Sequence, residues 1–261
     1  MENIHRQTMT NVKSVVNPDY AHIADYINNI PSVFDTEGML VYSGRNIVRR
    51  LTSPDGTPLI VKRFKFPNPI QRIAYSFYRP SKAKRAYEYG LKLLEMGFDT
   101  PCPIAYMETR NKCLFSHGYF VSTVDDRPDC TILRTDRHFD NDRLANDLME
   151  FFTHLHNKGV LHGDTNLSNF LYEKKGDKYH FSIIDTNRSK FVTPPVTKDQ
   201  CLTNLVRLTH VTDLLHQLVT TYANLRGWDA QQATTQVATM LKNFEQRRKV
   251  KHSLRFWKHS S

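Results

Sequence analysis

The stretch His162-Gly163-Asp164-Thr165-Asn166-Leu167-Ser168-Asn169 decides the fold of this chain. Within this stretch, Asp164 precedes Asn169 by five positions, and further along the chain an apolar run ends at Asp185. A single Asp or Asn is common in turns because its side chain hydrogen-bonds to the backbone nearby. Three oxygen-bearing side chains in this order and at this spacing indicate a functional site rather than three ordinary turns.

The segment between Asn169 and Asp185 has the pattern of a β-hairpin. The apolar triplet at 170–172 predicts a short strand, and Gly176-Asp177 predicts a turn. Residues 179–184 predict the returning strand. Since an antiparallel hairpin places its two open ends side by side, Asn169 and Asp185 are expected to reach the same ion.

The chemistry of these side chains favours phosphoryl transfer on a kinase-like fold. Mg²⁺ prefers hard oxygen ligands and usually takes one or two carboxylates together with phosphate oxygens. We therefore predict that Asn169 and Asp185 bind Mg²⁺ and, through it, ATP. Asp164 lies just before the hairpin and is the predicted catalytic residue, placed to accept the proton of an attacking hydroxyl. His162 is expected to be a packed histidine that holds the loop.

The region upstream, from about 38 to 66, predicts three strands. Residues 41–51 have the pattern strand, tight turn, strand, with Gly44 in the turn, and Ser53-Pro54-Asp55-Gly56 predicts a hairpin turn before the strand that ends at Lys62. A kinase small lobe has a loop that covers the phosphates, then a strand whose lysine contacts the α and β phosphates. Gly44 and Lys62 are the candidates. Taken alone, a single glycine is more typical of an ordinary turn, and Lys62 also belongs to a basic run.

A helix is predicted between Ser81, as its N-cap, and Gly97, as its C-terminal stop. Apolar residues recur along it at helical spacing. Glu88 borders the apolar stripe and is expected to face the small-lobe sheet, where it would pair with Lys62. Glu95, two turns further on, is the alternative partner.

The second half of the chain predicts a mainly helical lobe. One core helix contains Leu144 to Leu155 and stops at Gly159, another extends from Leu205 to Tyr222, and a last one from about 230 to 247. Only 76 residues follow Asp185, and they contain no Ala-Pro-Glu motif. Protein kinases dock peptides with that region, so a small-molecule or glycolipid acceptor is favoured.

Composition narrows the class of protein further. The chain has 261 residues, 39% hydrophobic and 24% charged, and a formal charge of +10 with a pI of about 9.4, which favours anionic partners. No apolar run is long enough to span a membrane, and residues 1–16 lack the apolar core of a signal peptide. The four cysteines show no metal-ligand spacing and are expected to be free thiols in the cytoplasm.

The chain resembles the lipopolysaccharide core kinase family, whose members phosphorylate 3-deoxy-D-manno-octulosonic acid (Kdo) or heptose in the inner core, and it is similar in outline to RIO-type and aminoglycoside kinases. The segments that carry the resemblance lie between about 40 and 190: Gly44-Arg45-Asn46, Val61-Lys62, Lys84-Arg85-Ala86-Tyr87-Glu88, Gly97-Phe98-Asp99-Thr100-Pro101, His162 to Asn169, and Ile184-Asp185-Thr186-Asn187-Arg188. The chain departs from the kinase pattern in its sparse glycine loop and in Asp185-Thr186-Asn187, where protein kinases have Asp-Phe-Gly.

The resemblance implies an α+β, bilobal protein-kinase-like fold. Residues 1–122 would form an N-terminal helix or linker and a β-rich N-lobe, and residues 123–261 a compact, mainly helical C-lobe with a basic tail. It also implies ATP-dependent transfer to a sugar hydroxyl, with Mg²⁺ as cofactor, at the inner face of the cell membrane. Lys62, Glu88, Asp164, Asn169 and Asp185 would have the usual kinase roles.

The sequence leaves open two alternative functions and the environment of one apolar helix face. The chain could be an atypical RIO-like protein kinase, or a non-catalytic basic module that binds nucleic acid or membrane with its basic tail, although no RNA-binding aromatic signature is present and no nucleic acid is expected. Residues 69–79 predict a helix with Ile70, Ile73, Ala74 and Phe77 on one face. Packing of this face on the lobe is slightly favoured over contact with an anionic membrane.

Overall fold

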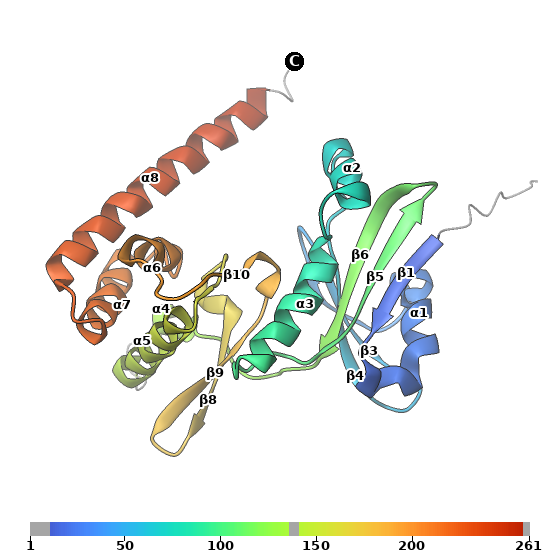
Figure 1. Cartoon of the computed structure of the whole chain (residues 1–261), viewed down its shortest axis with the longest axis horizontal. Coiled ribbons are helices and arrows are strands. Elements are labelled where there is room, and N and C mark those ends of the chain that lie inside the picture. Colours follow the sequence, from blue (N-terminus) through green and yellow to red (C-terminus); the bar gives the residue numbers. More distant parts are fainter. Residues whose placement is uncertain (1–10, 136–140, 258–261) are drawn as a thin grey trace, which may run out of the picture. The chain divides into compact units, whose positions relative to one another are not determined.

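The computed structural model describes residues 11–135 and 141–257, so Lys258 of the basic tail lies outside the described residues. The chain divides into two compact units, one ending at Asp126 and the other beginning at Arg127. The first is built around a large sheet and the second is mainly helical (Figure 1). The predicted α+β class is confirmed.

The first unit contains a six-stranded antiparallel sheet in the order β1-β5-β6-β4-β3-β2 (Figure 1). Its strands are β1 (Asn11–Val16), β2 (Met39–Ser43), β3 (Ile47–Thr52), β4 (Pro58–Arg63), β5 (Pro103–Asn111) and β6 (Leu114–Thr123). The three strands expected between 38 and 66 are confirmed as β2, β3 and β4. β1 was not expected, because only its valines carry a strand signal.

Helices cover both faces of this sheet. A 3₁₀ helix (Pro18–Ile23) and α1 (Ala24–Val33) bury Ile27 and Ile30 against one face, together with Val61 of β4. On the other face, α3 (Lys82–Glu95) packs Ala86 and Tyr87 against Phe64. Successive side chains of a strand point to opposite faces, so Lys62, next to Val61, projects on the face that α3 covers.

α3 begins and ends as its sequence predicts. The Ser81 hydroxyl accepts a hydrogen bond from the Lys84 amide at 3.1 Å, and Gly97 has a φ of +84°, the left-handed conformation that ends many helices. Between β4 and α3 lies a further helix, α2 (Pro69–Phe77). Its apolar face is not packed on the lobe as favoured above, because Ile70 is 80% exposed and Phe77 is 62% exposed.

The second unit combines helices with short strands. Its helices are α4 (Ile132–Thr135), α5 (Asn141–Asn157), α6 (Lys198–Leu205), α7 (Thr212–Leu225) and α8 (Ala230–Trp257). Its strands are β7 (Val160–Leu161), β8 (Phe170–Lys175), β9 (Lys178–Ile183) and β10 (Lys190–Phe191). The predicted hairpin is confirmed as β8 and β9, with Gly176 at a φ of +60° in its turn.

The single helix expected from Leu205 to Tyr222 is wrong, because residues 206–211 separate α6 from α7. The Leu208 carbonyl accepts a hydrogen bond from the Leu167 amide at 3.2 Å, and the Arg134 side chain donates to it at 3.0 Å. A carbonyl inside a helix would be used by the helix itself. The break therefore frees backbone groups to hold the loop that contains Asp164.

The predicted free thiols are confirmed for Cys102, Cys113, Cys130 and Cys201. Among the helices in the described part of the chain, none combines the length and the apolarity that a membrane span requires.

Candidate active site

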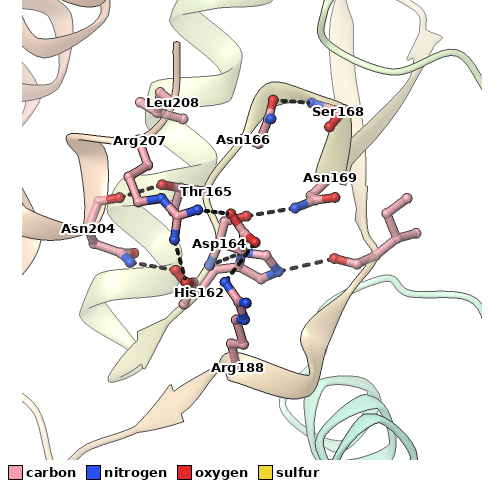
Figure 2. Close-up of polar contacts among 12 residues, drawn as sticks. His162, Asp164, Thr165, Asn166, Ser168, Asn169, Arg188, Asn204, Arg207 and Leu208 are labelled. Atoms are coloured by element: carbon pink, nitrogen blue, oxygen red, sulfur yellow. Dashed lines mark hydrogen bonds and ion pairs between the residues drawn. The ribbon is translucent and has the colours of Figure 1, made fainter. Parts of the chain in front are cut away.

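The loop between β7 and β8 positions Asp164 through its own backbone (Figure 2). The Asn169 side-chain amide donates to the Asp164 carbonyl at 2.8 Å, so the two ends of the loop are joined. Asn166 caps the short 3₁₀ helix Leu167–Asn169 by accepting from the Ser168 amide at 3.2 Å. These contacts fix the conformation of the loop before any substrate binds.

Asn169 and Asp185 lie at the same open end of the hairpin. The Ile184 amide donates to the Asn169 carbonyl at 3.0 Å, which places Asp185 one residue beyond that pair. Asp185 has a φ of 57°, in the left-handed region that Asp tolerates better than most residues. Its Oδ1 accepts from the Asn187 side chain at 2.5 Å.

These side chains fit Mg²⁺ by the chemistry of their donor atoms. The Asn169 amide nitrogen is engaged by the Asp164 carbonyl, so the amide oxygen is the end that can meet a cation. One amide oxygen and one carboxylate are hard ligands, and Mg²⁺ usually completes its shell with water and substrate phosphates. Among the described residues, no cluster of three or more His, Cys, Asp or Glu side chains could hold a metal without a substrate.

His162 is buried beneath the loop, where it links two backbone segments. The Asp164 amide donates to Nδ1 at 3.3 Å, so Nε2 carries the proton and donates to the Ile184 carbonyl at 3.1 Å. Burial lowers the pKa of His162, and the neutral ring is the form that this pair of hydrogen bonds requires. His162 therefore holds the loop against the end of β9, as expected for a packed histidine.

A second buried histidine extends this support to the helices. The Asn204 side chain of α6 donates to the His162 carbonyl at 2.6 Å, and its oxygen contacts Nε2 of His156 at 3.0 Å. Nδ1 of His156 contacts the Tyr222 hydroxyl at 2.6 Å. Burial lowers the pKa of His156 to about 4. A neutral chain of hydrogen bonds therefore runs from α7 through α5 and α6 to the loop that contains Asp164.

Gly163 allows two backbone segments to approach closely. A Cβ atom at this position would lie 2.2 Å from the Arg188 carbonyl oxygen, too close for any side chain. The close approach brings Arg188, which follows Asp185 by three residues, beside Asp164. A side chain at 163 would separate the two segments that carry the predicted base and the predicted metal ligand.

Two arginines contact the Asp164 carboxylate, one at each oxygen (Figure 2). Arg188 donates to Oδ2 at 3.1 Å, and Nη2 of Arg207 lies 2.8 Å from Oδ1. The carboxylate remains 21% exposed. It opens onto a pocket of about 420 Å³ that lies entirely within the second unit.

In the first unit, the structure shows the surroundings of the predicted nucleotide-binding residues. Nζ of Lys62 lies 5.4 Å from the centre of the Phe64 ring, on the α3 face of the sheet. Glu88 borders the buried face of α3 instead of lying in it, because its neighbour Tyr87 is the inward residue and its carboxylate is 3.5 Å from Nζ of Lys84. Gly44 is in an exposed turn between β2 and β3. The pairing of Lys62 with Glu88 stays a prediction.

Sequence reasoning missed the residues that hold the loop from outside it. Arg134, Arg207 and Asn204 lie far from Asp164 in the sequence and belong to no motif. Arg188 lies in a segment that carries the family resemblance, so its position could have drawn attention. A polar residue such as Asn204 at the end of a helix gives no sign of its partner before the fold is known.

Comparisons with known proteins identify the family and confirm the predicted kinase-like fold. The model of the lipopolysaccharide kinase (Kdo/WaaP) family matches residues 83–222, more than half of the chain. A solved structure described as WaaP in complex with acyl carrier protein is similar, with a TM-score of 0.58 and 16% identity, covering 90% of this chain and 97% of that one. A Rio2 kinase from Chaetomium thermophilum, described as an ADP/Mg²⁺-phosphoaspartate complex, gives a TM-score of 0.48 and 15% identity, covering 89% and 77% of the two chains. The search of curated proteins gave no match.

Proposed function

The chain belongs to the lipopolysaccharide kinase (Kdo/WaaP) family and is an ATP-dependent phosphotransferase, and from this premise we propose that it phosphorylates a sugar hydroxyl of a lipopolysaccharide inner core or a related glycolipid. One observation supports this most directly. Asp164 is held on a rigid loop with its carboxylate facing a pocket of about 420 Å³. An open pocket beside the proposed base gives an acceptor hydroxyl a place to bind.

In the proposed reaction, Asp164 accepts the proton of the acceptor hydroxyl as its oxygen attacks the γ-phosphorus of ATP. A new O–P bond forms, the bond between the γ-phosphorus and the β,γ-bridging oxygen breaks, and ADP leaves with that bond's electron pair. Catalysis of this kind depends on positioning and on electrostatic stabilisation of the phosphoryl group. The loop contacts of Asp164 provide the positioning.

Asn169 and Asp185 are the proposed ligands of Mg²⁺, which supplies positive charge to the β and γ phosphates when it is bound. Lys62 is the proposed contact to the α and β phosphates, and Glu88 the residue that orients it. Gly44 allows the β2–β3 turn to approach the nucleotide. The face of β4 on which Lys62 projects supports this assignment, since α3 covers that same face.

We place the protein in the cytoplasm, in peripheral contact with the anionic inner face of the membrane that contains its acceptor. The charge distribution supports this placement. Residues 62–92 contain nine Lys and Arg side chains and one acidic side chain, Glu88. Each basic residue near an anionic surface contributes about 1 kcal/mol of attraction.

The test is transfer of labelled phosphate from ATP to a panel of lipid A-core fragments. Wild-type protein should phosphorylate at least one fragment, and Asp164→Asn should reduce the rate by about 10²–10⁴, the usual effect of removing a general base. Nucleotide binding should survive this change. Asp177→Asn is a matched control, because Asp177 is exposed in the hairpin turn.

Near-normal transfer by Asp164→Asn would contradict the assignment of the base. Transfer to peptides, with none to any core fragment, would favour the protein-kinase alternative.

A further inference from the structure

The pocket beside Asp164 is lined by four separate parts of the second unit. These are helix α4, the loop that contains Asp164, the segment between α6 and α7, and helix α8. The lining residues that the argument uses are Arg134, Asp164, Asn166, Arg207, Phe244 and Glu245. The loop and α8 are far apart in sequence, so the pocket exists only in the folded unit.

Arg207 lies between the carboxylate of Asp164 and the wall formed by α8. Its Nη2 is 2.8 Å from Asp164 Oδ1, and its Nη1 donates to the Gly163 carbonyl at 3.4 Å. The guanidinium carbon is 5.4 Å from the centre of the Phe244 ring, which holds the flat group from the other side. A guanidinium has five N–H donors, so this position leaves donors for a ligand in the pocket.

Two arginines, Arg134 and Arg207, line the pocket together with the carboxylates of Asp164 and Glu245, and Arg188 brings a third guanidinium to Asp164. Arg188 and Arg207 together contact the single carboxylate of Asp164. Arg134 also lines the pocket, and its hydrogen-bond partners are neutral groups of Asn166, Leu208 and Thr209, at 2.8 Å, 3.0 Å and 3.2 Å.

Glu245 is exposed on α8, where water screens its charge from the arginines. Burial lowers the pKa of Arg134, with the Asp129 carboxylate acting in the opposite direction. A half-buried guanidinium with neutral partners is stabilised when an anion binds nearby.

We infer that this pocket binds an anionic group of the acceptor, a carboxylate or a phosphate on a sugar neighbouring the reacting hydroxyl, and that Arg207 is its principal ligand. The inference rests on the proposed function. Arg207 presents a planar fork, which matches a carboxylate or phosphate through two parallel hydrogen bonds. Arg134 adds a second positive charge at the same pocket.

This arrangement couples binding of the acceptor's anionic group by Arg207 to the loss of the ion pair between Arg207 and Asp164. Before the acceptor binds, Arg188 and Arg207 occupy both oxygens of Asp164. When Arg207 turns toward the anionic group, Oδ1 loses its partner and becomes able to accept the proton of the hydroxyl. Phe244 acts as a positioning residue, because its ring keeps the guanidinium plane beside the pocket.

The alternative is that Arg207 simply fixes the rotamer of Asp164. A rotamer clamp would affect every acceptor equally, whereas an anion ligand would affect only acceptors that carry the charge. The two roles are therefore separated by changing the acceptor and the arginine together.

The experiment uses three forms of one lipid A-core fragment: intact, with its sugar carboxylates methyl-esterified, and dephosphorylated. For wild-type protein, one of the two modifications should raise KM for the acceptor by about 10- to 100-fold, the usual worth of a hydrogen bond to a charged group. Arg207→Gln should raise KM for the intact fragment by a similar factor and show no further rise with that modified form. Arg207→Lys should lie between the two, because it keeps the charge without the fork.

Arg247→Gln, which removes a charge on α8 outside the pocket, is the matched control and should behave as wild type. Esterification as the effective change identifies a carboxylate, and dephosphorylation identifies a phosphate. Equal losses for all three fragment forms in Arg207→Gln would overturn the inference in favour of a rotamer clamp.

A binding titration with inorganic phosphate separates this inference from the proposed function, because it needs no turnover. Phosphate should bind wild-type protein and bind Arg207→Gln at least tenfold more weakly. Binding that is equal in the two proteins would overturn the anion site. Specific binding without phosphorylation of any core fragment would retain the anion site and contradict the proposed acceptor.

Discussion

The loop that contains Asp164, in the second unit, and helix α2, in the first unit, differ in how far their side chains are buried and hydrogen-bonded. In the loop, His162 is 1% exposed and its ring and carbonyl all have hydrogen-bond partners. On α2, Ile70 is 80% exposed and Phe77 is 62% exposed. Among the described residues, the hydrogen bonds that hold the loop all lie within its own unit, whereas no residue of the first unit buries the apolar face of α2. The loop therefore has a geometry that its own unit fixes, whereas the exposed face of α2 is available for contacts that the predictions below test.

The largest effect on nucleotide binding is expected from Asp185, at the open end of the β8–β9 hairpin. Asp185→Ala should abolish Mg²⁺-supported ATP binding, because it removes the only charged ligand of the proposed ion. Asn169→Ala should weaken it less, since the amide is neutral, although the variant also loses the 2.8 Å bond to the Asp164 carbonyl. Titration of Mg²⁺ against a fluorescent nucleotide measures both. Equal Mg²⁺ dependence in wild type and Asp185→Ala would place the ion elsewhere.

Lys62 tests whether the first unit supplies a group as essential as those of the loop. Lys62→Met should weaken ATP use strongly while leaving the unfolding midpoint nearly unchanged, because Lys62 is proposed to meet phosphate and is only half-buried. Glu88→Gln should give a milder loss, by orienting Lys62 less well. Steady-state kinetics with ATP varied, alongside thermal unfolding, separate the two effects.

Glu95→Gln is the matched variant two turns along α3 and should behave as wild type. A larger loss for Glu95→Gln than for Glu88→Gln would move the partner of Lys62 to Glu95.

The buried network behind the loop predicts a moderate and pH-dependent effect on stability. The pKa of His156 is about 4 in the folded protein, against 6.5 for an unperturbed histidine. The unfolded chain therefore binds more protons than the folded chain between these pH values. The contribution of His156 to the free energy of unfolding is fully present above pH 6.5 and is lost as the pH falls toward 4. One histidine with this shift contributes about 3 kcal/mol of loss by pH 4.

Urea unfolding between pH 7 and pH 4 measures this slope. His156→Gln removes the titrating group and should flatten the slope, while it retains an amide that can contact Asn204 and Tyr222. Burial also lowers the pKa of His162, which acts in the same direction, and Arg226 lies near enough to lower that of His156. A slope unchanged by His156→Gln would show that the network does not depend on a neutral His156.

Elements that depend on neighbouring residues could be predicted from the sequence. Elements that depend on contacts between distant segments could not. The hairpin, the Ser81 cap and the Gly97 and Gly159 stops follow from short-range rules, so they could be predicted from neighbouring residues alone. The break between α6 and α7 could not, because the Leu208 carbonyl is used by a loop about forty positions earlier. Arg134 and Arg207 were missed for the same reason, because their contacts with the loop join segments that are distant in sequence. Strand β1 was not predicted because its extended conformation is stabilised by pairing with β5, and its own residues do not indicate that partner.

The smallest effect concerns α2 itself, as reversible binding to an anionic membrane surface. Ile70, Ile73 and Phe77 lie on one exposed face, in a segment where basic side chains outnumber acidic ones by nine to one. An amphipathic helix with these features lies in the membrane interface, held by apolar burial and by attraction to anionic lipid. Wild-type protein should therefore co-sediment with anionic vesicles, bind neutral ones little, and be released by salt.

The decisive variant changes the apolar face without changing charge. Ile70→Ser combined with Phe77→Ser should weaken binding to anionic vesicles several-fold, since each apolar side chain that enters the interface contributes up to about 2 kcal/mol. Leu225→Ser is a matched control, because Leu225 is 44% exposed in the second unit, and it should bind as wild type. If the double variant bound as well as wild type, basic charge alone would be sufficient, and the exposed face of α2 would require another partner. If wild type bound neutral and anionic vesicles equally and resisted salt, attraction to anionic lipid would be excluded.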